Sequence, residues 1–224
     1  MFSAHLVFGD LDRHSSFEFK ERASALDVFW NVCDTAKPGG PENYTSSFYD
    51  VDNDSLMAGF SDFPGLYRGA DVLGWTLLLY RELVSRGLYA SFGVDLLALN
   101  QPVSWPTQLG FANDSRRMFI RDDLYCGNGV IPRSRIVGDA LIITARLVSL
   151  AKASNCPIVF SAYQGGNILE GLGSLESTLD RIRLVELTSK LDLIGDKSSD
   201  LAMRQVKAYG IKDLFSHPAE SSPK

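Results

Sequence analysis

The sequence predicts an α+β or α/β sandwich built on a mixed β-sheet. Some segments repeat apolar residues at helical spacing and others alternate them as strands do, and the segments are joined by both hairpins and longer crossovers. Hydrophobic residues make up 45% and charged residues 22% of the 224 residues, as in ordinary globular domains. We expect one domain over residues 1–215, with an irregular arm at about 100–134 and a flexible tail at 216–224.

The first predicted elements are a strand, a helix and a hairpin. An apolar run at 4–9 ends in acidic residues at 10 and 12, which is typical of a buried strand that delivers carboxylates to a site. Helical spacing over 19–36 stops at Pro38-Gly39-Gly40-Pro41. Two β-rich runs, 44–51 and 55–60, flank an Asp/Asn-rich turn and therefore predict a β-hairpin.

A second helix and a second strand follow the hairpin. Apolar residues from Leu66 to Val84 recur at intervals of three and four, and Arg86-Gly87 supplies the signal that ends this helix. Strict alternation over 88–96 then predicts a strand with one buried face.

The second half mixes one irregular stretch with further regular elements. Proline and glycine interrupt residues 100–134, which contain a short β-like piece at 118–120. We expect a helix over 139–153, a strand over 157–162 and one or two helices within 165–193. A late strand should begin near Arg204, with residues 213–215 as its hairpin partner.

Composition excludes several function classes. A net charge of −5 argues against a protein that grips nucleic acid through its phosphates. Three scattered cysteines predict neither a disulfide framework nor a zinc site, and no apolar stretch is long enough to span a membrane, so we expect a cytoplasmic protein. Neither GxxxxGK[ST] nor GxGxxG occurs.

Asp10 and Asp54 are the first candidate site residues. If the hairpin pairs beside the first strand, their carboxylates converge and can bind two divalent ions. The alternative is that Asp54 is an ordinary turn residue. Asp12 is expected in the following loop, where it faces solvent or caps the helix. Arg146, in a mostly apolar helix, either forms a salt bridge or neutralises charge on a phosphate.

Taken together, four motifs resemble the catalytic domain of class III nucleotide cyclases. The motifs are His5–Leu11, Asn53–Ala58, Ser91–Asp95, and Gly138–Arg146 followed by Ile158–Ser161. The resemblance implies the family's ferredoxin-like core, an α+β fold with a mixed, mainly antiparallel sheet flanked by helices. It also implies a head-to-tail homodimer, since the family's sites form between two domains.

The resemblance further implies a chemistry and a set of roles. Two Mn²⁺ or Mg²⁺ ions, bound by Asp10, Asp54 and the carbonyl of Leu11, activate a ribose 3′-hydroxyl that attacks the α-phosphate and expels pyrophosphate. Arg146 falls on the family's transition-state arginine. Lys212, or as a second choice Lys207, falls near the lysine that binds triphosphate.

One departure from the family lies in the helix that carries the arginine. Ile142 stands where the family has an asparagine that contacts the ribose. The implied polar contact is therefore absent unless another side chain supplies it.

The positions that read the base depart from both purine patterns. They fall near Asp50 and Arg135, with the bulky Tyr49 adjacent. This combination resembles bacterial pyrimidine cyclases of antiphage signalling, and because Arg135 can donate to uracil carbonyls, UTP is favoured and CTP comes next. The product would act on a separate effector.

Two alternatives to a pyrimidine cyclase stay open. One is an adenylate or guanylate cyclase with atypical base contacts. The other is an inactive cyclase-like module that binds a nucleotide and regulates a partner.

Overall fold

The computed structural model describes most of the regular elements of the chain. The residues it describes are 2–12, 16–37, 47–61, 69–99, 118–121, 125–126, 129–130, 135–162, 182–199 and 207–213. Among these residues, no helix has the length and apolar character needed to cross a membrane.

Seven strands form one sheet in the order β10-β11-β9-β4-β1-β3-β2. All neighbours in it are antiparallel except β4 and β9, which pair in parallel. Its strands are β1 (Phe2–Leu11), β2 (Ser47–Asp52), β3 (Ser55–Ser61), β4 (Ala90–Leu99), β9 (Ile158–Ala162), β10 (Ile182–Glu186) and β11 (Lys207–Asp213). The fold is thus α+β with a mixed, mainly antiparallel sheet, as expected.

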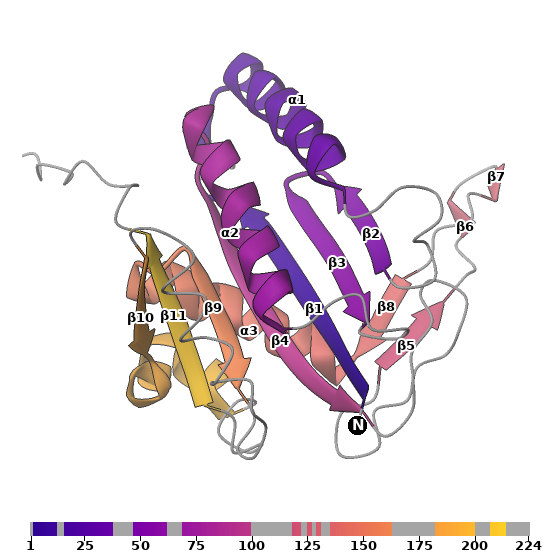
Figure 1. Ribbon diagram of the computed structural model, residues 1–224. Coiled ribbons are helices and arrows are strands. Elements are labelled where there is room, and N and C mark those ends of the chain that lie inside the picture. The colour runs from indigo at the N-terminus through magenta and orange to yellow at the C-terminus, as the bar shows by residue number, and fades with distance from the viewer. Residues whose placement is uncertain are drawn as a thin grey trace, which may run out of the picture.

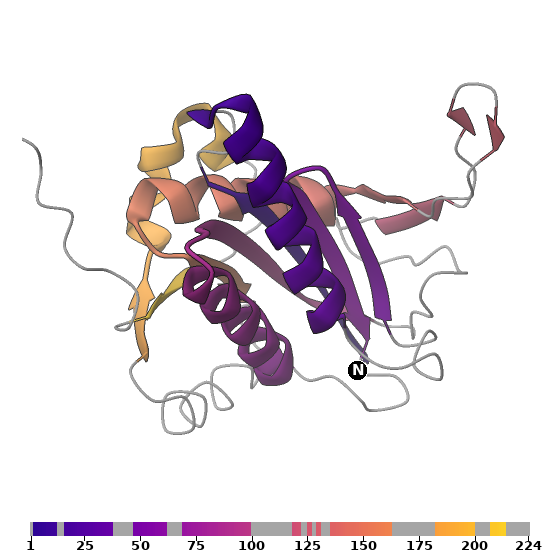
Figure 2. The same cartoon turned by 90° about the horizontal axis from the view of Figure 1, so that it is seen from above.

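Helices cover both faces of this sheet (Figures 1 and 2). They are α1 (Phe19–Ala36), α2 (Gly69–Ser85), α3 (Asp139–Ser154) and the 3₁₀ segment η3 (Thr188–Lys197). Helices α1 and α2 lie on one face, where the larger core forms around residues such as Phe29, Leu77 and Phe92. On the other face, α3 and η3 cover a smaller core that includes Leu147 and Val159.

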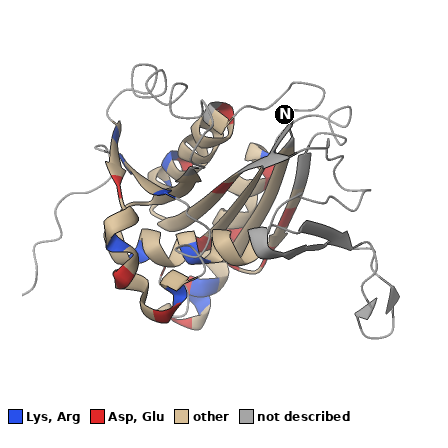
Figure 3. Cartoon of the chain, turned by 90° about the horizontal axis from the view of Figure 1, so that it is seen from below, with Lys and Arg blue, Asp and Glu red and all other residues tan. Residues whose placement is uncertain are grey.

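Alternation along the strands assigns side chains to the two faces. In β1, Val7 and Leu11 belong to the core beneath α1 and α2, so Asp10 lies on the face that α3 covers. On this face, the ribbon colours in Figure 3 mark basic residues along α3 and residues of both charges along η3.

Local chemistry explains where several elements begin and end. At the start of α1, the backbone N–H of Glu18 donates to the Glu21 carboxylate at 3.4 Å. Helix α2 ends at Ser85, just before the expected stop signal Arg86-Gly87. Gly87 has a φ of 80°, which glycine adopts without strain. Its N–H donates to the carbonyl of Val84 at 2.9 Å.

Two expectations in the second half of the chain can be compared with the structure. Of residues 165–193, where we expect one or two helices, the structure describes only 182–193, and these form strand β10, which was not expected, and the start of the 3₁₀ segment η3. The rest of that range lies outside the described residues. Asp213, the first residue of the expected hairpin partner, belongs to β11 itself and pairs with Ile182, and residues 214–215 lie outside the described residues. Both edges of β11 are occupied, by β9 and β10.

Most of the expected arm and all of the expected tail lie outside the described residues. Within the arm, β5 (Met118–Arg121) confirms the short β-like piece and pairs with β8 (Arg135–Gly138). A second small pair joins β6 (Tyr125–Cys126) to β7 (Gly129–Val130).

Candidate functional site

The end of β1 and the turn between β2 and β3 lie side by side. Asp10 is opposite Ser55 in the strand pairing, and the N–H of Leu11 donates to the backbone carbonyl of Asp54 at 2.9 Å. The fold therefore brings the chain at Asp10, Leu11 and Asp54 together, and the Asp54 side chain is half-buried there.

The turn that carries Asp54 is also attached to a helix. It is a two-residue loop in which Asn53 has a φ of 51°, a left-handed conformation that asparagine tolerates. The indole N–H of Trp30, on α1, donates to the carbonyl of Asn53 at 2.7 Å. Together with the bond from Leu11, this contact fixes the turn from two sides. The role of Trp30 could not be predicted from the sequence, because it depends on a contact between segments 23 residues apart.

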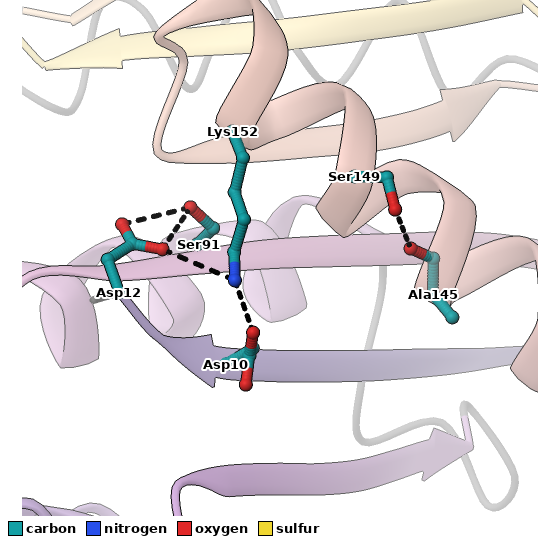
Figure 4. A network of polar contacts seen from close by, with 6 residues as sticks. All are labelled: Asp10, Asp12, Ser91, Ala145, Ser149 and Lys152. Carbon is teal, nitrogen blue, oxygen red and sulfur yellow. Dashed lines mark hydrogen bonds and ion pairs between the residues drawn. The ribbon is translucent and has the colours of Figure 1, made fainter. Parts of the chain in front are cut away.

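A lysine from α3 lies over the same strand end (Figure 4). The ammonium group of Lys152 contacts the carboxylate of Asp10 and lies 3.7 Å from Oδ1 of Asp12. The hydroxyl of Ser91, on β4, donates to Asp12 Oδ1 at 2.9 Å and to Oδ2 at 3.1 Å. Two carboxylates, one ammonium group and one hydroxyl thus form a single polar network.

The position of Asp12 corrects the expectation of a solvent-facing or helix-capping residue. Its N–H donates to the carbonyl of Tyr89 at 2.8 Å, which extends the contact of β1 with the chain at the start of β4. Asp12 therefore lies on the same face as Asp10. Burial raises the pKa of the Asp12 carboxyl above its usual value, while the Ser91 hydrogen bond and the charge of Lys152 act in the opposite direction.

The part of Lys152 in this network could not be predicted from the sequence. Asp10 and Asp12 are spaced as neighbours on one strand face, and Lys152 is a cation in the last turn of its helix. Neither observation predicts that Lys152 contacts the end of β1, because the contact depends on how α3 crosses the sheet.

Arg146 and Lys212 lie on the α3 side of the sheet but away from this network. Arg146 precedes Lys152 by six residues, or about 9 Å along the helix axis, and its side chain is half-buried. Lys212 is exposed on β11, three strands from β1, which is about 14 Å. Lys207, the second choice, begins the same strand. Ile142 is 45% exposed on α3.

The three expected base-reading residues do not lie together on one face. Asp50 is opposite Met57, which is opposite Phe8, so Asp50 shares the face of Asp10. Tyr49 packs against the core on the opposite face, and its hydroxyl donates to the backbone carbonyl of Cys33 at 2.5 Å. This corrects the expectation that Tyr49 lines a base pocket. The side chain of Arg135 lies outside the described residues.

The donor chemistry at the end of β1 fits a divalent cation. Carboxylate oxygens are ligands that Mg²⁺ and Mn²⁺ prefer, and the ammonium group of Lys152 already occupies the position of a cation beside Asp10. Within the part of the chain that the structure describes, no group of three or more His, Cys, Asp or Glu side chains is placed to hold one ion. A metal here would thus depend on a pair of carboxylates and on further ligands.

Comparison with solved structures finds this fold in catalytic domains of nucleotide cyclases. The adenylyl cyclase CyaB from P. aeruginosa superposes with a TM-score of 0.53 at 13% identity, over 95% of this chain and 94% of that chain. A bacterial light-regulated adenylyl cyclase superposes with a TM-score of 0.51 at 13% identity, over 84% of this chain and 85% of that chain. The guanylate cyclase domain of RhGC from Catenaria anguillulae, in complex with GTP, superposes with a TM-score of 0.50 at 13% identity, over 94% of this chain and 96% of that chain.

These likenesses show the fold of a cyclase catalytic domain. No protein-family model and no curated protein matches the sequence.

Proposed function

We propose that this protein is a nucleotide cyclase, which converts a nucleoside triphosphate to its 3′,5′-cyclic monophosphate and pyrophosphate. One observation carries the proposal. In a fold shared with cyclase catalytic domains, the hydrogen bond from Leu11 to Asp54 brings the end of β1 and the β2–β3 turn together. The two aspartates expected to bind metal therefore come from adjacent strands.

Each acidic residue has a distinct part in this proposal. Asp10 and Asp54 would hold two divalent ions, Mg²⁺ or Mn²⁺, with the carbonyl of Leu11 as a further ligand. When bound, the ions lower the pKa of the attacking hydroxyl and offset the charge of the triphosphate. Leu11 and Trp30 act on the protein side, since their hydrogen bonds to the β2–β3 turn fix the backbone at Asp54.

A second copy of the chain would complete the site. Arg146 would stabilise charge on the α-phosphate and Lys212 would bind the triphosphate, but both lie away from Asp10 within one chain. A head-to-tail homodimer resolves this separation, because each copy can present these cations to Asp10 and Asp54 of the other. The placement of Arg146 and Lys212 supports that arrangement.

We further propose a pyrimidine substrate, with UTP favoured over CTP and both favoured over purines. After the correction of Tyr49, this preference rests on Asp50 and Arg135, which match neither purine pattern. A guanidinium donates to the carbonyl oxygens of uracil but not to the exocyclic amino group of cytosine. The cyclic product would be the signal for a separate effector, as in antiphage defence.

Product analysis tests this proposal. The purified protein is incubated with Mn²⁺ and each of ATP, GTP, CTP and UTP, and the products are identified by liquid chromatography and mass spectrometry. We expect cyclic UMP and pyrophosphate from the wild type and at least a hundredfold less from Asp54→Asn. Predominant cyclic AMP or cyclic GMP would refute the pyrimidine preference and favour a purine cyclase.

A second candidate function is regulatory binding without turnover. The observation that favours it is Ile142, an exposed apolar side chain on α3 where the resemblance implies a ribose-binding asparagine. If the wild type binds nucleotide but releases no pyrophosphate, and Ile142→Asn does not restore release, the regulatory function is correct.

A further inference from the structure

We propose that Lys152 is a built-in counter-ion that occupies the acidic cluster when no metal is bound, and that a divalent ion must displace it. The acidic cluster consists of Asp10 and Asp12. This inference rests on the proposed function, because it concerns the metal ions of that site. It identifies a residue that sets the metal concentration the protein needs.

The contacts of Lys152 support this role. Its ammonium group contacts Oδ2 of Asp10 and lies 3.7 Å from Oδ1 of Asp12. The carboxylate of Asp12 has both oxygens engaged by the Ser91 hydroxyl, whereas Asp10 is the closer partner of the lysine. A metal that binds the Asp10 carboxylate therefore competes with Lys152 for the same carboxylate group.

The electrostatic setting makes this competition strong enough to measure. The side chains of Asp10 and Asp12 are 29% and 28% exposed, and that of Lys152 is 41% exposed, so water screens the three charges only in part. Two close carboxylates repel each other unless a cation lies beside them. Lys152 supplies that cation, and its positive charge also repels an approaching divalent ion.

The lysine is also free to leave its position. It lies in the last turn of α3 and reaches the acidic cluster through a flexible four-carbon stem. Rotation about the side-chain bonds moves the ammonium group into solvent without a change in the backbone. An ion can therefore enter the site without any movement of the helix.

Metal binding to the protein tests the proposal without nucleotide or a measurement of activity. Free Mn²⁺ is followed by electron paramagnetic resonance during titration of the wild type, Lys152→Met, Lys152→Arg and Lys20→Met. Lys20 is exposed on α1, on the other side of the sheet, so Lys20→Met is a control with the same change in net charge. We expect Lys152→Met to bind Mn²⁺ about tenfold more tightly than the wild type.

The other variants define the mechanism. Lys152→Arg keeps the positive charge and should bind no more tightly than the wild type, and Lys20→Met should agree with the wild type within about twofold because its charge is screened. Thermal unfolding provides a second measurement. In EDTA, Lys152→Met should melt below the wild type, and saturating Mn²⁺ should raise its midpoint by more than it raises that of the wild type.

The results distinguish this inference from the proposed function. If Mn²⁺ binds to the wild type and is lost in Asp10→Asn, but Lys152→Met binds no more tightly, Lys152 does not compete and only this inference fails. The inference also fails if Lys20→Met gains as much affinity. If neither the wild type nor Lys152→Met binds Mn²⁺, the inference and the two-metal chemistry both fail.

Discussion

Gly93 of β4 lies directly against the backbone of α3 at Thr144. A β-carbon on Gly93 would lie 2.1 Å from the carbonyl oxygen of Thr144 and 2.9 Å from the β-carbon of Leu147. Backbone atoms cannot yield as a flexible side chain does, so glycine alone permits this approach. The contact sets how closely α3 packs on the sheet, and α3 carries both Arg146 and Lys152.

Gly93→Ala should therefore destabilise the protein by about 3 kcal/mol, because the new methyl group forces α3 away from the sheet. Urea unfolding followed by circular dichroism measures the change. Gly87→Ala is the matched control: a β-carbon there meets no atom within 4 Å, although φ is +80°, and it should cost about 1 kcal/mol. Equal losses for the two variants would contradict the close packing described above.

Trp30→Phe should weaken metal binding more than it weakens the fold. The variant keeps an aromatic ring on α1 but removes the donor to the carbonyl of Asn53, so the turn that carries Asp54 loses its hydrogen bond to α1 and keeps the one from Leu11. We expect Mn²⁺ affinity to fall about fivefold and the free energy of unfolding to fall by about 1 kcal/mol. Titration with Mn²⁺ beside urea unfolding separates the two effects. An unchanged affinity would show that the Leu11 bond is sufficient.

Tyr49→Phe should lower stability and leave base selectivity unchanged. The tyrosine hydroxyl donates to the carbonyl of Cys33 at 2.5 Å, and its ring packs edge-on against Trp75. Losing the hydrogen bond should cost about 1 kcal/mol. The relative rates with UTP, CTP, ATP and GTP should match those of the wild type. A change in these relative rates would indicate that Tyr49 contacts the base.

Alkaline pH should destabilise the fold through Cys33. Burial raises the pKa of its thiol from 9.0 to about 12. Below the pKa that the thiol has in the unfolded state, it is protonated in both states, and its full contribution to the free energy of unfolding is present. Above it the unfolded state ionises first, so the free energy of unfolding falls by up to about 1.4 kcal/mol per pH unit until the folded pKa is reached.

Cys33→Ala tests this dependence. Stability is measured by urea unfolding between pH 8 and 11 for the wild type and the variant. The difference in free energy of unfolding between the wild type and Cys33→Ala should shrink as the pH rises above 9.0. A constant difference across this range would mean that Cys33 does not titrate on unfolding.

Elements with a repeating local signal could be predicted from the sequence. Helix α1 matches its expected range, and α2 ends at Ser85, just before the expected stop signal at Arg86-Gly87. Strand β10 was missed because it is only five residues long and none of its side chains is fully buried, so residues 182–186 lack the apolar pattern of a central strand. Its place in the sheet is determined by pairing with β11, which lies more than twenty residues later.

In the candidate site too, some residues could be predicted from the sequence and others could not. The adjacency of Asp10 and the β2–β3 turn follows from a hairpin beside the first strand, and it could be expected from sequence. Tyr49 could not be assigned correctly, because a shift of one residue in register moves a side chain to the other face. Lys152 comes from a segment 142 residues away from Asp10, and only tertiary packing reveals it.

The parallel pairing of β4 with β9 bears on how the chain is synthesised. Strands β1 to β4 can assemble with α1 and α2 once the first hundred or so residues have left the ribosome. Until residues 158–162 emerge, the outer edge of β4 stays open, and an open strand edge invites pairing with other chains. Chaperone demand during translation should therefore be greatest before β9 is made.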